Sequence, residues 1–270
     1  SFSKLNLSLY VGPPTTEGFH YLKSLFQCIS LSEEVHITES RNACDSVQFL
    51  HQTVPNDNTC TKMMALLRPY LKKYWDIQVN KCIPQGAGLG AGSANAAALC
   101  QAILSLEGIH MPLHKQMALG QQVGYDVPFF MCGGSTALVS GFGEQIDVQT
   151  GLKKYVVLIL PGIECSTPLV YQSLDKQGAF DDLDHVGDQA LYTFGTNRLF
   201  LAAASVYPEL INIKEQLEGI INQPVFFSGS GSTFYVLADT LDDQSKLYES
   251  FKAQTSFDVC KAEFCEDTIT

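Results

Sequence analysis

Long apolar segments and clusters of basic residues are both missing from this sequence. No stretch approaches the run of about 18 apolar residues that a membrane-spanning helix needs, so we expect no membrane partner. Lysine and arginine number 17 against 28 aspartates and glutamates, which gives a net charge of −11. Because duplex binding needs clustered cations, this balance argues against nucleic acid as a partner. Anionic nucleotides stay possible, since backbone N–H groups can hold them.

Paired metal-ligand spacings are also missing. The nine cysteines include no C-x-x-C pair and are widely scattered, so we interpret them as free thiols in a reducing compartment. His110 and His114 are four residues apart, but Pro112 between them interrupts any continuous helix. We interpret both histidines as loop residues, and the sequence predicts no metal site.

The hydrophobic periodicity of the 270 residues changes near residue 150, and it predicts two domains, over 1–150 and 151–270. No evident linker marks the boundary between them. The order of elements in the second part indicates an α+β sandwich. Strands are expected at 3–11, 25–31, 35–38, 75–79, 135–139, 155–160, 225–227, 234–238 and 257–262. Helices are expected at 59–73, 94–106, 113–123, within 186–217 and at 241–253, and loops at 124–130 and 228–233.

The most informative part of the chain is the glycine-rich segment (residues 84–95), which reads PQGAGLGAGSAN. Glycine has no Cβ, so successive N–H groups can turn toward a phosphate and approach it closely. The Ala- and Leu-rich run that follows predicts a helix whose positive dipole end would meet the same phosphate. Ser93 and Asn95 would add neutral donors there. A turn for tight helix–strand packing is the plain alternative, but the alternation of glycines with small residues favours a phosphate site.

Two better-known phosphate loops do not fit this segment. Residues 86–91 satisfy G-x-G-x-x-G/A, but a dinucleotide fold also needs a strand ending in an acid about 20 residues later. Glu107 stands there, at the end of a predicted helix and before a glycine. A P-loop ends in Gly-Lys-Ser/Thr, and the segment contains no lysine. Another kind of phosphate loop is therefore expected.

Further short motifs follow in order along nearly the whole chain. They are SKLNL at 3–7, GFH at 18–20, Asn58, the glycine-rich segment, DVPFF at 126–130, G-x-GE at 141–144, P-x₅-TP-x₂-Y at 161–171 and SGSGS at 228–232. Together they resemble the superfamily of galactokinase, homoserine kinase, mevalonate kinase and phosphomevalonate kinase, and within it the 4-diphosphocytidyl-2-C-methyl-D-erythritol kinase family. The resemblance implies an α+β two-domain fold, with a ribosomal-S5-like N-terminal domain that binds ATP and carries catalysis. It also implies a ferredoxin-like C-terminal domain that binds the substrate.

The implied reaction is ATP-dependent phosphorylation of the 2-hydroxyl of 4-diphosphocytidyl-2-C-methyl-D-erythritol, a step of non-mevalonate isoprenoid biosynthesis, with Mg²⁺ accompanying ATP. Two alternatives stay open: another kinase of the superfamily, of mevalonate or homoserine type, and a non-catalytic nucleotide or metabolite sensor. Bacterial cytoplasm fits such a chain, as does plastid stroma if a transit peptide was removed. The sequence does not indicate an oligomeric state.

The resemblance places catalysis at Lys4 and Asp126. Phosphoryl transfer needs the acceptor hydroxyl aligned with the γ-phosphorus and its developing negative charge relieved. A carboxylate can accept the proton, and an ammonium can lower the pKa of the hydroxyl. From the pattern alone, Lys4 would be a solvated residue on the polar face of a strand, and Asp126 would cap a turn.

The binding residues implied by the resemblance fall into two sets. For ATP they are Asn58 and Lys81 around the adenine, and Pro84, Gly86, Gly88, Leu89, Gly90, Gly92, Ser93 and Asn95 around the phosphates. For the substrate they are Asn6, Phe19, His20, Thr167, Tyr171, Gly229 and Ser230, of which Phe19, His20 and Tyr171 would surround the cytidine. The plain alternatives are an N-cap at Asn58, a surface charge at Lys81, a sheet-edge amide at Asn6, core rings at Phe19 and Tyr171 and a loop histidine at His20.

The chain also departs from the family pattern. Ala87, Ala91 and Ala94 stand where the family usually has glycine or serine, and Phe19 stands where it usually has tyrosine. Ala94 removes a hydroxyl that could reach a phosphate or Mg²⁺, and it is the one feature that favours a sensor. Phe19 keeps a stacking face and loses a hydroxyl.

Overall fold

The computed structural model describes residues 1–266, which form two compact units assembled from separate segments. Unit 1 contains Ser1–Ser3, Ser32–Ile83 and Gly90–Gly134, and unit 2 contains Lys4–Leu31, Pro84–Leu89 and the chain from Ser135 onward. This partition differs from a division at residue 150, because it groups Lys4–Leu31 and Pro84–Leu89 with the later part of the chain. Single β-bridges join Leu9 to Asn197 and Ile29 to Phe264 inside unit 2. Both units combine helices with sheets, in agreement with the predicted α+β class.

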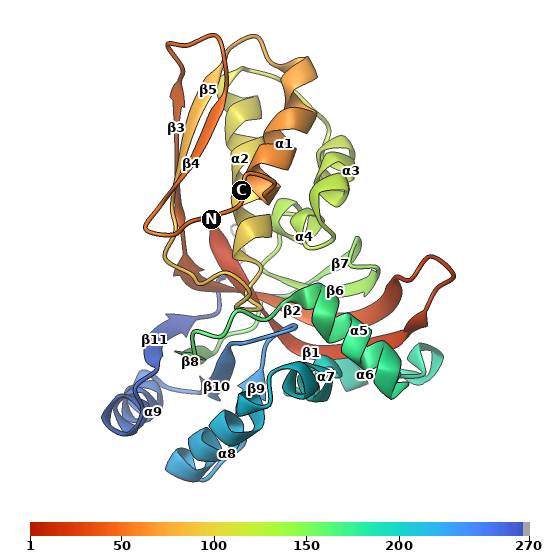
Figure 1. The fold of residues 1–270 in the computed structure, drawn as a ribbon, viewed down its shortest axis with the longest axis vertical. Helices are drawn as coiled ribbons and strands as arrows, with labels where there is room; N and C mark the ends of the chain where they lie inside the picture. The colour runs from red at the N-terminus through yellow and green to blue at the C-terminus, as the bar shows by residue number, and fades with distance from the viewer. Residues whose placement is uncertain (267–270) are drawn as a thin grey trace. The chain divides into compact units, whose positions relative to one another are not determined.

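Unit 1 is built on a mixed three-stranded sheet with the order β3 (Glu34–Glu39), β5 (Trp75–Asn80), β4 (Ser46–Leu50). Strand β3 runs antiparallel to β5, and β4 runs parallel to it. One face of the sheet is covered by helices (Figure 1), namely α1 (Thr59–Leu67), α2 (Ala91–Leu106), α3 (Leu113–Val123) and α4 (Val127–Met131). The apolar residues of the strands alternate, as expected for a sheet with one buried face.

Helix α2 forms the centre of the unit 1 core. Ala96, Leu99 and Cys100 are fully buried on it, in one cluster with Met63 and other apolar residues of α1. Small residues such as alanine favour the helix and allow neighbouring helices to approach. Because this helix continues directly from the glycine-rich segment, its packing holds one end of that segment.

Three predicted boundaries in unit 1 were wrong. Helix α2 begins at Ala91 rather than at residue 94, so the end of the glycine-rich segment is itself helical. Helix α1 ends at Leu67, because Pro69 follows within a 3₁₀ turn (Arg68–Tyr70). The loop predicted at 124–130 contains α4, whose proline lies in the first turn, where a missing N–H costs little.

Unit 2 contains two four-stranded sheets. One has the order β1 (Phe2–Pro14), β2 (His20–Ser32), β6 (Thr136–Gly141), β7 (Gln145–Gln149), with the first residues of β1 and the last of β2 assigned to unit 1. The other is antiparallel, with the order β11 (Asp258–Glu263), β8 (Tyr155–Leu160), β10 (Phe234–Ala238), β9 (Phe226–Phe227).

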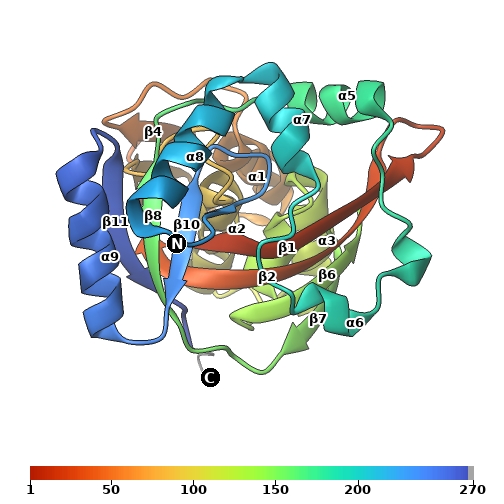
Figure 2. The same ribbon diagram turned by 90° about the horizontal axis from the view of Figure 1, so that it is seen from below.

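The helices of unit 2 include α5 (Thr167–Gln177), α7 (Leu199–Val206), α8 (Glu209–Ile221) and α9 (Leu241–Gln254), with the short α6 (Asp188–Leu191) and a 3₁₀ turn (Leu183–His185) between α5 and α7. Helix α9 packs on the sheet that contains β8, and α8 lies beside α9 (Figure 2). Within residues 1–266, no helix combines the length and the apolar character needed to cross a bilayer.

The core of unit 1 allows a direct test on a single helix. Leu99→Ala should lower the free energy of unfolding by about 2–5 kcal/mol, because it empties a fully buried position. Leu106→Ala on the same helix is the matched control, since this side chain is 55% exposed, and its effect should stay within about 0.5 kcal/mol. Urea denaturation followed by circular dichroism measures both. Equal effects would contradict the assigned core.

Candidate functional site

The glycine-rich segment uses three glycines in a left-handed backbone conformation. Their φ angles are +66° at Gly86, +73° at Gly88 and +67° at Gly90, a region that residues with a Cβ rarely adopt. Gly90 is also the N-cap residue of α2. The first N–H groups of a helix have no partner inside the helix, and the helix dipole adds partial positive charge. The segment therefore ends in a group of amides suited to an anion, and phosphate binding there stays a prediction.

Gly88 packs directly against the serine–glycine loop (residues 228–233). A Cβ on Gly88 would lie 2.2 Å from the carbonyl oxygen of Ser228 and 2.9 Å from that of Gly231. The hydroxyl of Ser228 donates to the carbonyl of Gly88 at 2.9 Å, and the N–H of Thr233 donates to the carbonyl of Ala87 at 3.2 Å. Two loops far apart in the sequence thus form one backbone-lined surface in unit 2.

Lys4 and Asn6 form a buried polar pair on β1. Each is 4% exposed, and Lys4 Nζ donates to Asn6 Oδ1 at 2.5 Å. The amide of Asn6 donates in turn to Ser24 Oγ at 3.0 Å, and Lys4 Nζ lies 4.3 Å from the ring centre of Phe26. The interpretation of Lys4 as a solvated lysine is therefore wrong, because the polar face of this strand is buried inside the unit.

The same pair adjoins both loops. The backbone N–H of Lys4 donates to the carbonyl of Leu89 at 2.9 Å, and that of Asn6 donates to Ser228 Oγ at 3.3 Å. A Cβ on Gly229 would lie 3.2 Å from Asn6 Oδ1. Unit 2 therefore brings together Lys4, Asn6, the glycine-rich segment up to Leu89 and the serine–glycine loop. This arrangement places one buried cation beside two loops that can present backbone amides.

His20 is held in one orientation near the start of β2. It is 7% exposed, and its Nδ1 lies 2.8 Å from the carbonyl oxygen of Gly12, so Nδ1 carries the proton. Nε2 lies 3.2 Å from Asp175 Oδ1 without hydrogen-bond geometry. The rings of Tyr171 and Phe180 lie 5.1 and 5.8 Å from the imidazole. His20 is thus a fixed, buried imidazole rather than an ordinary loop histidine.

Three further aromatic residues of this region were not predicted. The ring of Phe180 packs near the imidazole of His20. The only sequence feature that sets Phe180 apart is its position directly before the acidic run at 181–184. Phe142 lies 5.8 Å from Phe19 and stacks on Tyr21 at 4.6 Å. Phe19 is 47% exposed, so the interpretation of Phe19 as a core ring is wrong.

Thr167 and Ser230 connect α5 to the serine–glycine loop. Their hydroxyl oxygens are 2.7 Å apart, and Thr167 is the first residue of α5, the helix that also carries Tyr171. Near the N-terminal end of α5, the N–H of Cys165 donates to the carbonyl of Gly86 in the glycine-rich segment at 3.3 Å. Burial raises the pKa of the Cys165 thiol to about 12, so this thiol is neutral at physiological pH.

In unit 1, Asn58 caps α1. Its Oδ1 accepts from the N–H of Thr61 at 3.0 Å, and the Thr61 hydroxyl accepts from the N–H of Asn58 in return. The plain alternative for Asn58 is therefore confirmed, and a contact with adenine stays a prediction. The hydroxyl of Thr59 donates to the carbonyl of Gly92 at 2.6 Å, which connects α1 to the first turn of α2.

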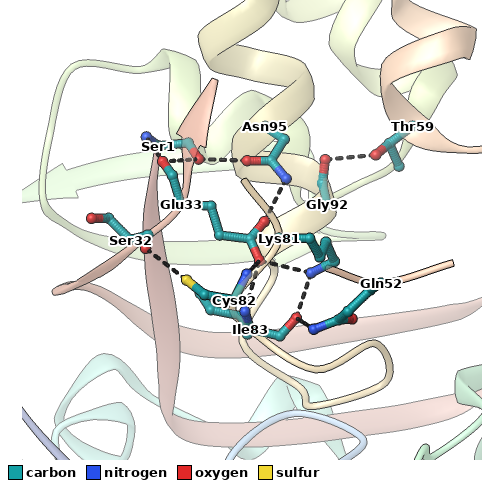
Figure 3. Close-up of polar contacts among 10 residues, drawn as sticks. All are labelled: Ser1, Ser32, Glu33, Gln52, Thr59, Lys81, Cys82, Ile83, Gly92 and Asn95. Atoms are coloured by element: carbon teal, nitrogen blue, oxygen red, sulfur yellow. Dashed lines mark hydrogen bonds and ion pairs between the residues drawn. The ribbon is translucent and has the colours of Figure 1, made fainter. Parts of the chain in front are cut away.

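Lys81 and Asn95 both contact Glu33, a residue that the sequence did not single out (Figure 3). Lys81 is 7% exposed and forms an ion pair with Glu33 at 2.8 Å, so its interpretation as a surface charge is wrong. Asn95 is fully buried, and its Nδ2 donates to Glu33 Oε2 at 2.7 Å. The donor expected from the Asn95 side chain at the helix start is therefore already engaged.

Asp126 immediately precedes α4, and its carboxylate makes no capping hydrogen bond to that helix. The plain interpretation as a cap is therefore wrong. Asp126 belongs to unit 1 and Lys4 to unit 2, so the expected proximity of the two groups stays a prediction. Within the described residues, no three His, Cys, Asp or Glu side chains gather in a way that could hold a metal ion.

Comparison with known proteins identifies relatives along nearly the full chain. Residues 58–134 match the family model described as GHMP kinases N terminal domain. A Bacillus licheniformis protein named 4-diphosphocytidyl-2-C-methyl-D-erythritol kinase is 30% identical over 263 residues, covering 93% of this chain and 91% of the relative. A relative of the same name from Thermotoga maritima is 40% identical over 182 residues, covering 66% of this chain and 65% of that protein.

Two solved structures are also similar to this chain over nearly its whole length. A crystal structure of 4-(cytidine 5'-diphospho)-2C-methyl-D-erythritol kinase superimposes with a TM-score of 0.77 at 27% identity, covering 97% of both chains. A crystal structure of mevalonate kinase superimposes with a TM-score of 0.71 at 14% identity, covering 98% of both chains, which shows a shared fold.

The contact between Gly88 and the serine–glycine loop can be tested with a matched pair of substitutions. Gly88→Ala and Gly108→Ala both place a Cβ on a left-handed residue, at a cost of about 1–2 kcal/mol. Only Gly88→Ala also drives that Cβ into backbone oxygens, since nothing lies within 4 Å of a Cβ at Gly108. We expect a clearly larger drop in melting temperature and weaker binding of an ATP analogue for Gly88→Ala. Equal behaviour of the two variants would contradict the packing of these loops.

Proposed function

Because the chain belongs to the 4-diphosphocytidyl-2-C-methyl-D-erythritol kinase family, we propose that it transfers the γ-phosphoryl group of ATP to the 2-hydroxyl of 4-diphosphocytidyl-2-C-methyl-D-erythritol. The observation that carries this proposal is the 30% identity to a kinase of that name over 93% of the chain. The family resemblance inferred from the order of short motifs is thereby confirmed. The protein is an ATP-dependent kinase of isoprenoid biosynthesis.

In this proposal, the triphosphate is bound by backbone amides. The amides at the start of α2 would bind phosphate oxygens of ATP, supported by the left-handed glycines of the glycine-rich segment. The backbone amides of the serine–glycine loop, which carries Gly229 and Ser230, would bind the phosphates of the substrate. Mg²⁺ would enter with ATP and neutralise charge on the phosphates. Ser93, in the first turn of α2, offers the hydroxyl oxygen that suits this hard cation, while Ala94 next to it offers none.

Asp126 and Lys4 would act on the acceptor hydroxyl. Asp126 would orient the hydroxyl and accept its proton as the oxygen attacks the γ-phosphorus. Lys4 would place a positive charge beside the developing alkoxide, which lowers the pKa of the hydroxyl. The buried position of Lys4, with Asn6 and the ring of Phe26 against its ammonium, supports a fixed charge in this role.

The cytidine end of the substrate would bind near His20. The ring faces of Phe19 and Tyr171 suit a stacked pyrimidine, and Phe180 adds a further aromatic wall beside His20. With Nδ1 committed to Gly12, His20 offers Nε2 as its remaining polar atom. The named relatives are bacterial, which agrees with the expected location in a bacterial cytoplasm, and plastid stroma stays the other prediction.

One assay separates this function from its alternatives. The protein is incubated with ATP, Mg²⁺ and one acceptor at a time, and ADP release is measured by a coupled reaction. We expect turnover with 4-diphosphocytidyl-2-C-methyl-D-erythritol and none with mevalonate or homoserine. Turnover with one of the other two would reassign the substrate. Tight ATP binding without ADP release from any acceptor would favour the sensor.

Asp126→Asn tests the proposed base. The amide keeps the size of the side chain and cannot accept the proton, so kcat should fall by about 10²–10⁴-fold. The dissociation constant of a non-hydrolysable ATP analogue, measured by calorimetry, should stay nearly unchanged. Asp258→Asn on the exposed side of β11 is the matched control and should keep full activity. An Asp126→Asn variant with most of its kcat would remove Asp126 from the mechanism.

A further inference from the structure

Glu33 lies between β2 and β3 with its carboxylate buried in unit 1. Its side chain is 0% exposed. Oε1 accepts from Lys81 Nζ at 2.8 Å and from the backbone N–H groups of Ile83 and Cys82 at 2.8 and 3.2 Å. Oε2 accepts from Asn95 Nδ2 at 2.7 Å (Figure 3). A buried carboxylate is costly unless donors satisfy it, and here both oxygens are satisfied.

These donors flank the glycine-rich segment along the chain. Cys82 and Ile83 directly precede Pro84, where the segment begins. Asn95 is its last residue and lies in α2, which begins just after Gly90. One carboxylate therefore joins the residues before the segment to the helix that follows it. Charge-assisted hydrogen bonds of this kind are shorter and stronger than neutral ones.

The partners of Glu33 are themselves held in place. Lys81 Nζ also donates to the carbonyl of Ile83 at 2.5 Å, and Gln52 Nε2 reaches the same oxygen at 3.4 Å. Asn95 Oδ1 accepts from Ser1 Oγ at 2.5 Å. Lys81 and Asn95, expected from the sequence to contact ATP, thus direct side-chain donors toward Glu33.

We propose that Glu33 is a positioning residue for nucleotide binding, which acts through residues 81–83 and Asn95 to hold the glycine-rich segment in its phosphate-binding conformation. The glycines give this segment wide backbone freedom, and fixing its two ends removes much of the entropy that it would otherwise lose on binding. The inference rests on the proposed function, since ATP is its ligand.

Glu33→Gln tests the role with a minimal change of shape. Both oxygens of Glu33 face donors, so either orientation of the new amide sets an NH₂ group against another donor. We expect the KM for ATP and the dissociation constant of an ATP analogue to rise about tenfold or more. The KM for the acceptor should stay unchanged. A lower melting temperature with unchanged ATP affinity would show a merely structural role and overturn the proposal.

Glu34→Gln is the matched control. It makes the same chemical change at the next residue, whose side chain is 70% exposed, and it should leave both KM values unchanged. If Glu33→Gln does not fold, Asn95→Ala takes its place in the same measurements, because it removes one donor and leaves the ion pair of Glu33 with Lys81 intact. Normal ATP affinity in that variant would overturn the proposal.

A double substitution provides the rescue. Asn95→Asp alone sets two carboxylates against each other, whereas Glu33→Gln combined with Asn95→Asp restores one donor and one acceptor at the same contact. We expect the double variant to recover ATP affinity to within about threefold of wild type, where each single variant loses about tenfold or more. A double variant as weak as the single variants would count against the proposal.

Hydrogen–deuterium exchange without nucleotide separates this inference from the proposed function. Peptides that cover residues 84–95 should exchange faster in Glu33→Gln than in wild type or Glu34→Gln, because the hydrogen bonds that hold the two ends of the segment are weakened. A wild-type protein that does not bind ATP would refute the proposed function, while the exchange rates would still show whether Glu33 holds the segment. Unchanged exchange in Glu33→Gln would refute the inference even if the kinase activity stands.

Discussion

The left-handed backbone of the glycine-rich segment is the constraint on which the candidate site depends. At Gly88 this conformation brings the main chain against the carbonyl oxygens of Ser228 and Gly231, closer than any side chain would permit. The same turn delivers the chain to Gly90, where α2 begins and its free amides collect. The proposed phosphate binding by backbone groups would also allow a chain with a net charge of −11 to bind a polyanion.

Buried polar side chains lie next to this backbone in both units. In unit 2, Lys4 and Asn6 are held under the loops by Ser24 and Phe26, so the charge proposed for catalysis is fixed before any substrate arrives. In unit 1, the carboxylate of Glu33 accepts hydrogen bonds from Lys81 and Asn95, which lie near the two ends of the glycine-rich segment. Both arrangements place ionic groups away from water, where unpaired charges would be costly and paired ones are rigid.

The sequence predicted local features well and distant contacts poorly. The strand at the N-terminus, the glycine-rich segment and the helix after it follow from periodicity and composition within a few residues. The burial of Lys4 did not, because its alternating pattern is that of a half-exposed strand, while its neighbours Phe26 and Leu89 lie elsewhere in the sequence. Glu33 was missed because its partner Lys81 is 48 residues away and no local pattern pairs them.

The aromatic site shows the same limit. The motif order pointed to His20 and Tyr171, whereas Phe180 and Phe142 became visible only through ring contacts made in the folded chain. Strands β4 and β7 were also missed, because each has only five residues. The family relationship, which rests on many weak motifs in order, was easier to predict from the sequence than any single tertiary contact.

A crystal structure with a non-hydrolysable ATP analogue and Mg²⁺ tests the central claim most directly. The account predicts phosphate oxygens at about 3 Å from backbone nitrogen atoms within residues 86–95, at the start of α2. A nucleotide bound elsewhere, or amides of this segment turned into the protein with the analogue present, would contradict it.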